Sequence, residues 1–113
     1  MKAKTPHFAL DRVKQMVEAE QFMIQQGRAL VFLGGSFKEA RAEMKEVIAS
    51  LTLRNFSRSD QLTWDMADIY GVRYRNGGWY LKLTIDEKAP EVAIISFHPL
   101  QSPLRTNSGE IKP

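Results

Sequence analysis

Residues 77–85 read GGWYLKLTI, and from Trp79 onward large apolar side chains alternate with more polar ones. A period of two is typical of a β-strand that buries one face. The apolar set consists of Trp79, Leu81, Leu83 and Ile85. The opposite face carries Tyr80, Lys82 and Thr84. A phenol and an ammonium beside a double glycine form either an ordinary solvent-facing surface or the floor of a binding site.

The composition of the chain is that of an ordinary globular protein. Its 113 residues include 43% hydrophobic and 26% charged side chains, and this length suggests one domain. We expect that domain to span residues 1–98, followed by a flexible tail at residues 99–113, which are rich in proline, serine and polar residues. The net charge of +3 is compatible with a nucleic-acid partner but does not require one.

Several classes of protein are excluded by what the sequence lacks. It contains no cysteine, which excludes disulfides and thiolate metal sites. No apolar run approaches the length of a membrane span. The basic residues near the N-terminus are not followed by the apolar segment of a secretory signal. We therefore expect a cytoplasmic protein with no membrane partner.

Two helices are predicted upstream of the opening strand. Residues 8–22 place apolar side chains at helical spacing. The second helix begins after Ser36, which forms a capping-box pattern with Glu39, and runs to about Ser50. Between the helices, residues 22–25 fit a short strand, and residues 29–33 fit either a strand or a helical turn. The apolar stripe of the second helix is Phe37, Ala40, Met44, Val47, Ile48 and Leu51.

The second half of the chain predicts an antiparallel meander. Strand patterns cover residues 66–74, 79–86 and 92–98, after a polar connector at residues 51–64. The turn Asn76-Gly77-Gly78 suits a tight hairpin, because asparagine and glycine accept positive φ at low cost. Short links between successive strands favour antiparallel pairing. The sequence therefore predicts an α+β domain with helices packed on one face of a small sheet. The residues expected in its core are Trp79, Leu81, Leu83, Ile95 and Phe97.

Residues that can cleave RNA gather on the far face of this expected sheet. His98 lies opposite the buried Phe97 in parity, as Tyr80 and Lys82 lie opposite Trp79 and Leu81. Cleavage without a metal needs groups that move protons and cations that stabilise the charged phosphorane. Histidine titrates near neutral pH, arginine binds phosphate in a bidentate way, and tyrosine can donate a proton or stack on a base. Further arginines of the hairpin and the connector are Arg54, Arg58, Arg73 and Arg75.

A plainer interpretation of the same residues is also available. A tyrosine and a lysine on the outer face of a strand are more often solvated than catalytic. A lone histidine at a strand end is usually a structural or surface residue, and scattered arginines usually serve solubility. From spacing alone, this interpretation is the more frequent outcome.

A colinear set of short motifs resembles the MqsR family of toxins. Residues 4–7 read KTPH and lead into LDRVK at residues 10–14, while WYLKLTI at residues 79–85 is followed by ISFH at residues 95–98. The family shows a TPH start, a V-K pair in its first helix, a VYLKIT-like strand and a VSFK-like strand. Between them, Asn55-Phe56 and Asp68-Ile69-Tyr70 are similar to the family's D-F segment and D-V-Y strand. The resemblance covers residues 4–98.

The resemblance implies a RelE-like fold and a metal-independent endoribonuclease that cuts messenger RNA and is held inactive by a cognate antitoxin. It implies no cofactor. Tyr80 matches the family's active-site tyrosine, and Arg58 stands where a lysine is expected. Ala67 occupies the position of a glutamine, and His98 that of a second lysine. His7 matches the TPH motif, in which a structural hydrogen bond is as plausible as a catalytic role.

Three hypotheses follow. The first is a toxin ribonuclease in which Tyr80, His98 and Arg58 are catalytic, Lys82 and Arg73 contact the substrate, and no metal is bound. The second is a catalytically impaired RelE-fold module that binds RNA or a protein, motivated by the missing glutamine. The third is a module that binds protein only. Digestion of RNA with and without EDTA separates the first from the second, and RNA binding at low salt separates both from the third.

Overall fold

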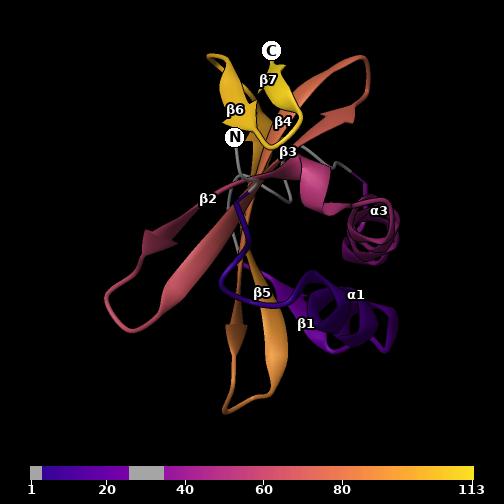
Figure 1. The fold of residues 1–113 in the computed structure, drawn as a ribbon. Coiled ribbons are helices and arrows are strands. Elements are labelled where there is room, and N and C mark those ends of the chain that lie inside the picture. Colours follow the sequence, from indigo (N-terminus) through magenta and orange to yellow (C-terminus); the bar gives the residue numbers. More distant parts are fainter. Residues whose placement is uncertain (1–3, 26–34) are drawn as a thin grey trace.

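The computed structural model describes residues 4–25 and 35–113. Within these ranges a five-stranded sheet has the strand order β1-β5-β4-β3-β2, and β6 and β7 form a separate two-stranded sheet. Figure 1 shows α1 and α3 together on one side of the larger sheet. The elements are α1 (Leu10–Glu18), β1 (Phe22–Ile24), α3 (Phe37–Ala49), the 3₁₀ turn η1 (Leu53–Asn55), β2 (Phe56–Gln61), β3 (Met66–Tyr74), β4 (Gly77–Asp86), β5 (Glu91–Pro99), β6 (Leu104–Thr106) and β7 (Gly109–Ile111). The α+β prediction is confirmed.

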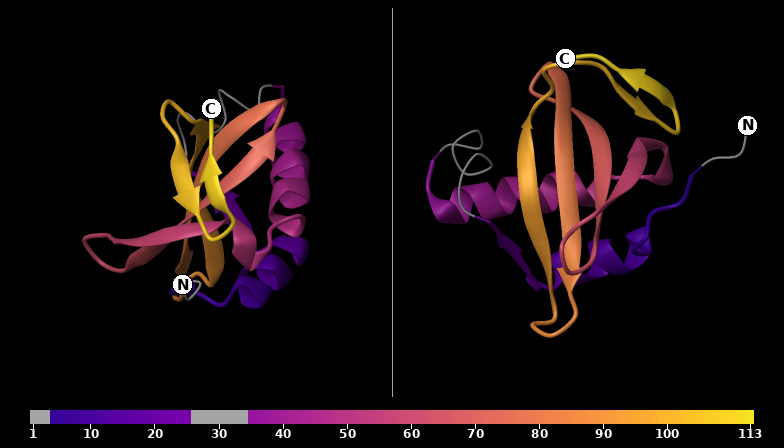
Figure 2. Two further views of the ribbon diagram at one scale, coloured as in Figure 1. Left: turned by 45° about the horizontal axis from the view of Figure 1, so that its top comes forward. Right: turned by 90° about the vertical axis from the view of Figure 1, so that its left-hand side faces the viewer.

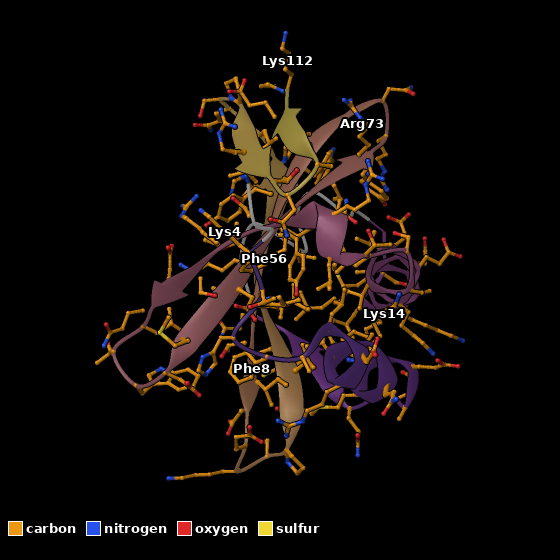
Figure 3. The ribbon with its side chains drawn as sticks, in the orientation of Figure 1. Lys4, Phe8, Lys14, Phe56, Arg73 and Lys112 are labelled. Carbon is orange, nitrogen blue, oxygen red and sulfur yellow. The ribbon has the colours of Figure 1, made fainter. Side chains whose placement is uncertain are left out.

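Both predicted helices form, and each buries the side that its apolar pattern indicates. Helix α1 buries Leu10, Val13, Met16 and Val17. The Ser36 side chain accepts a hydrogen bond from the Glu39 amide at 3.1 Å, so it caps α3 as its sequence predicts. The Lys14 ammonium lies between the two helices (Figure 3) and donates to the Leu51 carbonyl at 2.8 Å. Phe37 belongs to the predicted apolar stripe but is not buried with it, because this residue begins α3 and is 56% exposed.

The meander is confirmed and is longer than predicted. Strands β2, β3, β4 and β5 pair antiparallel in succession, while β1 pairs in parallel with β5. Most of the expected polar connector is therefore η1 and β2. The β3–β4 link is the pair Arg75 and Asn76, both at positive φ (47° and 63°), as two-residue hairpin loops of the I′ type require. The segment at residues 29–33 lies outside the described residues.

A bulge in β5 changes the core from the one predicted by strict alternation. Lys82 pairs with Ser96, but the next residue of β4, Leu83, pairs with Ile94. Ile95 is the extra residue, so alternation is interrupted there. Ile94 is fully buried in the main core, whereas Ile95 is only half-buried. The prediction for Ile95 is therefore wrong, and those for Trp79, Leu81, Leu83 and Phe97 are confirmed.

The segment after Pro99, expected to be a loose tail, instead forms the hairpin β6–β7. Figure 2 shows this hairpin on the side of the sheet away from the helices. Its Leu104 and Ile111 pack with Ile69 and Leu100 in a second apolar cluster. A Cβ at Gly78 would lie 2.2 Å from the Lys112 carbonyl oxygen, so the glycine allows the chain to approach β4 closely.

The buried carboxylate of Asp68 fixes the N-terminal segment to the helix side of the sheet. It accepts hydrogen bonds from the backbone amides of His7 and Phe8, both at 2.9 Å, and from the Ser59 hydroxyl at 2.5 Å. Asp68 has no exposed surface, and charge-assisted bonds of this kind compensate the cost of burying a carboxylate. The Thr-Pro-His and Asp-Ile-Tyr motifs are thus connected in the fold.

Candidate active site

Tyr80 and His98 lie next to each other on the far face of the sheet. They are directly paired across β4 and β5. Their rings stack with centroids 5.0 Å apart and planes inclined by 13°. The bulge in β5 lies between Ile94 and Ser96, before His98 is reached, so the parity that places His98 opposite Phe97 is preserved.

The neighbouring row of the sheet brings two cations and one carboxylate to the same face. Arg58 is paired with Ile69, which is paired in turn with Lys82. Asp60 lies two residues beyond Arg58 on β2 and contacts both cations. Its carboxylate is 3.2 Å from the Arg58 Nε and 3.7 Å from the Lys82 Nζ. The carboxylate therefore restrains the orientation of both side chains from one side.

A cleft of about 310 Å³ opens over Tyr80, His98 and Arg58. One wall of the cleft is the connection between β5 and β6 with the first residue of β6, and the residues of that wall are Leu100, Gln101, Ser102, Pro103 and Leu104. The cleft thus combines a guanidinium, a phenol and an imidazole with a largely uncharged wall. Such a group of side chains can hold a phosphate and transfer protons.

The surroundings of Tyr80 keep its phenol protonated. Partial burial raises its pKa above the ordinary value, the positive charge of Arg58 lowers it, and the negative charge of Asp60 raises it. Burial is the largest of these effects, and the net direction is upward. Part of this burial comes from the second apolar cluster, against which Tyr80 packs. At neutral pH the phenol can therefore donate a proton or a hydrogen bond.

The hydrogen bond of His98 assigns its neutral tautomer. Its Nδ1 lies 2.9 Å from the Pro99 carbonyl oxygen. Because a carbonyl can only accept, Nδ1 carries the proton, and Nε2 is the ring nitrogen that accepts one. The ring can therefore act as a base when neutral and as an acid when charged.

A second, larger hollow lies on the helix side of the protein. It has a volume of about 480 Å³ and is lined by Thr5, Pro6, Ala9, Leu10, Asp11, Lys14, Leu51, Thr52 and Leu53. Its ionisable groups are Asp11 and Lys14, and the Lys14 ammonium already donates to a backbone carbonyl. This hollow lacks the combination of phenol, imidazole and guanidinium that the sheet cleft contains.

Comparison with protein families gives one match. The model of the family described as motility quorum-sensing regulator, toxin of MqsA, matches residues 5–99. The chain belongs to this family. Membership in the MqsR toxin family supports a toxin of a toxin–antitoxin system, with an antitoxin as its partner. A search of curated proteins finds no match.

The residues singled out through the MqsR resemblance are distributed over both faces of the sheet. Tyr80, Arg58 and His98 line one cleft. Ala67 is paired with Asp60 on β2 and is completely buried, so no side-chain amide is available at that position. His7 is not among the described residues that line the cleft. Its backbone amide binds Asp68, and its Nε2 is 3.9 Å from the Asp65 carboxylate.

The other arginines singled out from the sequence, Arg54, Arg73 and Arg75, are not among the described residues that line the cleft. Arg73 is exposed near the β3–β4 turn (Figure 3) and lies outside the set of described residues that line the cleft. Arg75 binds the Glu43 carboxylate at 2.9 Å. Arg54 is exposed on η1. Lys82 lies two residues after Tyr80 on β4. Its ammonium contacts the Asp60 carboxylate, which also binds Arg58 of the cleft.

The sequence analysis missed two parts of this candidate site. Asp60 was available from the alternation Arg58-Ser59-Asp60, which places Asp60 and Arg58 on one face once this stretch is known to be a strand. The wall at residues 100–104 gave no signal, because its proline and serine content indicates irregular structure.

No helix among the described residues is long and apolar enough to span a membrane.

Proposed function

We propose that this member of the MqsR toxin family is an endoribonuclease that cleaves messenger RNA without a metal ion. The observation that carries the proposal is the stacked pair of Tyr80 and His98, with Arg58 in the same cleft. These groups supply a proton acceptor, a proton donor and a phosphate-binding cation, the set that cleavage by the RNA's own 2′-hydroxyl needs.

In the proposed reaction, His98 Nε2 takes the proton of the 2′-hydroxyl. The 2′-oxygen then forms a bond to phosphorus while the bond from phosphorus to the 5′-oxygen breaks. Tyr80 gives its proton to the leaving 5′-oxygen, for which its raised pKa keeps the proton available. The products are a 2′,3′-cyclic phosphate and a 5′-hydroxyl, and a proton passes from His98 to Tyr80 through solvent to complete the cycle.

The cations of the site stabilise the charge that develops on the phosphorane. Arg58 lines the cleft and is half exposed, so its guanidinium can grip two phosphate oxygens. Lys82 adds positive charge from the neighbouring row, and Asp60 holds both cations in place. Arg73 is not among the described residues that line the cleft, so its contribution to substrate binding is through long-range charge.

The cellular setting follows from the proposed substrate. A ribonuclease that acts on messenger RNA works in the cytoplasm, and the family's antitoxin would block it there. Expression of the chain alone should arrest bacterial growth, and co-expression of the antitoxin encoded beside it should restore growth. Unaffected growth, together with no co-purifying neighbour, contradicts the toxin assignment.

The direct test is digestion of a defined messenger RNA by the purified chain, with and without EDTA. We expect equal cleavage in both, cyclic phosphate at the 3′ ends of the products, and no cleavage by a Tyr80→Phe/His98→Ala protein prepared in parallel. Cleavage that EDTA abolishes, or that survives in the double variant, overturns the proposal.

A second candidate function rests on Ala67. The resemblance implies a glutamine there, and a buried alanine cannot replace its hydrogen bonds. A catalytically impaired protein of this fold would bind RNA, or a protein partner, through the same cationic cleft. Retained RNA binding with no cleavage under any of the conditions above favours this candidate.

A further inference from the structure

The segment after residue 99 is outside the family match and yet forms one wall of the cleft. The family model ends at Pro99. The five following residues, Leu100, Gln101, Ser102, Pro103 and Leu104, line the cleft together with Tyr80, His98 and Arg58. These five residues therefore lie beyond the part of the chain that the family model matches.

The wall is held in place at both of its ends. At one end, the Leu100 amide donates to the Gly78 carbonyl at 2.9 Å. At the other, the Ser57 hydroxyl donates to the Arg105 carbonyl at 2.5 Å, and the Asn107 amide donates to the Phe56 carbonyl at 2.9 Å. A loop fixed on both sides presents its side chains in one geometry, which selective recognition requires.

Between these anchors the wall exposes two hydrogen-bonding side chains. Gln101, Ser102 and Pro103 are exposed, whereas Leu100 and Leu104 are buried against the sheet. The amide of Gln101 offers both a donor and an acceptor, and Pro103 offers a flat apolar surface. None of these three is charged, so they add no cation for the phosphate, while the amide of Gln101 and the ring of Pro103 can contact a nucleobase.

The size of the cleft limits what can occupy it. Its volume of about 310 Å³ is at the lower end of the range for small-molecule sites, about 300–1,000 Å³. This space suits one nucleotide better than a longer segment. With the phosphate beside Arg58 and the reacting groups at Tyr80 and His98, the part of the lining left for the base of that nucleotide is the wall at residues 100–104.

We propose that residues 100–104 form a nucleobase subsite in which the Gln101 amide selects an adenine next to the scissile phosphate. Adenine presents the N6 donor and N7 acceptor that a glutamine amide matches in a bidentate way. This inference rests on the proposed ribonuclease function, and it adds the residue that determines where the chain cuts.

The test compares cleavage of a random-sequence RNA pool by the parent and by Gln101→Ala, with Gln21→Ala as a matched control. Gln21 is an exposed glutamine between α1 and β1. The parent and the control should favour adenine at one position flanking the cut, and Gln101→Ala should lose about fivefold or more of that preference. Gln101→Glu should shift the preference toward cytosine, whose N4 amino group donates to a carboxylate. An unchanged preference in Gln101→Ala overturns the inference.

A binding measurement separates this inference from the proposed chemistry. Short 2′-deoxy homopolymers of adenine, cytosine and thymine cannot be cut by a 2′-hydroxyl mechanism. The parent should bind the adenine polymer most tightly, and Gln101→Ala should bind the three equally. If the parent cleaves no RNA but shows this pattern, the ribonuclease proposal fails and the subsite stands. If both proteins rank the polymers alike, the subsite assignment is wrong.

Discussion

The imidazole of His98 stacks on the phenol of Tyr80, with ring centroids 5.0 Å apart, because the two residues are directly paired on β4 and β5. The stack holds the two groups side by side at the base of a cleft that Arg58 also lines. A phosphate that reaches the cleft therefore meets a proton acceptor and a proton donor together.

The first prediction concerns His98. His98→Ala should lower RNA cleavage by about 10²–10⁴-fold, the usual contribution of a general acid or base. His98→Lys, which restores the residue type that the resemblance implies, should retain part of the activity by adding charge near the phosphate. Single-turnover cleavage of a defined RNA measures both effects. The free energy of unfolding should change little, because His98 is only partly buried. A His98→Ala protein that cleaves at the parent rate removes His98 from the mechanism.

The second prediction concerns the pKa of Tyr80. Asp60 raises this pKa and Arg58 lowers it. Asp60→Asn should therefore lower the pKa of the phenol, and Arg58→Met should raise it. Titration of tyrosinate absorbance measures the shift, with a Tyr80→Phe protein subtracted to remove Tyr70 and Tyr74.

The same change should move the pH dependence of cleavage. If Tyr80 donates the proton, activity falls as pH rises through its pKa, so Asp60→Asn should bring that fall to lower pH than in the parent. A shift of the alkaline limb in the opposite direction, or identical titrations in the parent and Asp60→Asn, contradicts the assigned electrostatics.

The third prediction concerns the glycine pair at the start of β4. A Cβ at Gly78 would lie 2.2 Å from the Lys112 carbonyl oxygen and 2.8 Å from atoms of Ile111 and Leu100. Gly78→Ala should therefore displace the C-terminal hairpin and open the cleft wall. Hydrogen exchange in residues 100–113 should become faster in this variant.

Gly77→Ala is the matched control, because the nearest atom to its added Cβ is 3.9 Å away. Both variants add one methyl group to adjacent positions of one strand, so a difference between them reports the contact with the hairpin. Equal exchange protection in Gly78→Ala and Gly77→Ala is incompatible with the packing described.

The fourth prediction concerns Asp68. Asp68→Asn should lower the free energy of unfolding by about 1.5–3 kcal/mol, because the buried amides of the N-terminal segment lose a charged acceptor. Asp11→Asn, an exposed change in the first turn of α1, should cost less than about 1 kcal/mol. Denaturant unfolding measures both. Native Asp68→Asn protein should still cleave RNA, since this carboxylate binds the N-terminal segment rather than the cleft; loss of cleavage in fully folded protein would place Asp68 in the mechanism.

The sequence by itself determined the two helices and the strands β3, β4 and β5. The alternation around Trp79, the capping box at Ser36 and the short links between strands are local properties, and each acts within a few residues of chain. The sequence also sufficed to place Tyr80 and His98 on one face, because each directly follows a large apolar residue, Trp79 or Phe97, that the core buries. The resemblance to the MqsR toxin family was visible from the sequence because its motifs are short stretches that lie in order along the chain.

Only the tertiary structure decided which residues complete the site. The bulge at Ile95 depends on the pairing register between β4 and β5. Alternation within β5 alone therefore assigned Ile94 and Ile95 to the wrong faces. The ordered structure of residues 100–113 depends on the sheet surface at Ile69 and Gly78, which are distant in sequence from this segment. Leu104 and Ile111 pack with Ile69, and the chain near Lys112 passes close to Gly78. A short polar segment has too little apolar surface to fold alone, and its structure is therefore set by the sheet on which it packs.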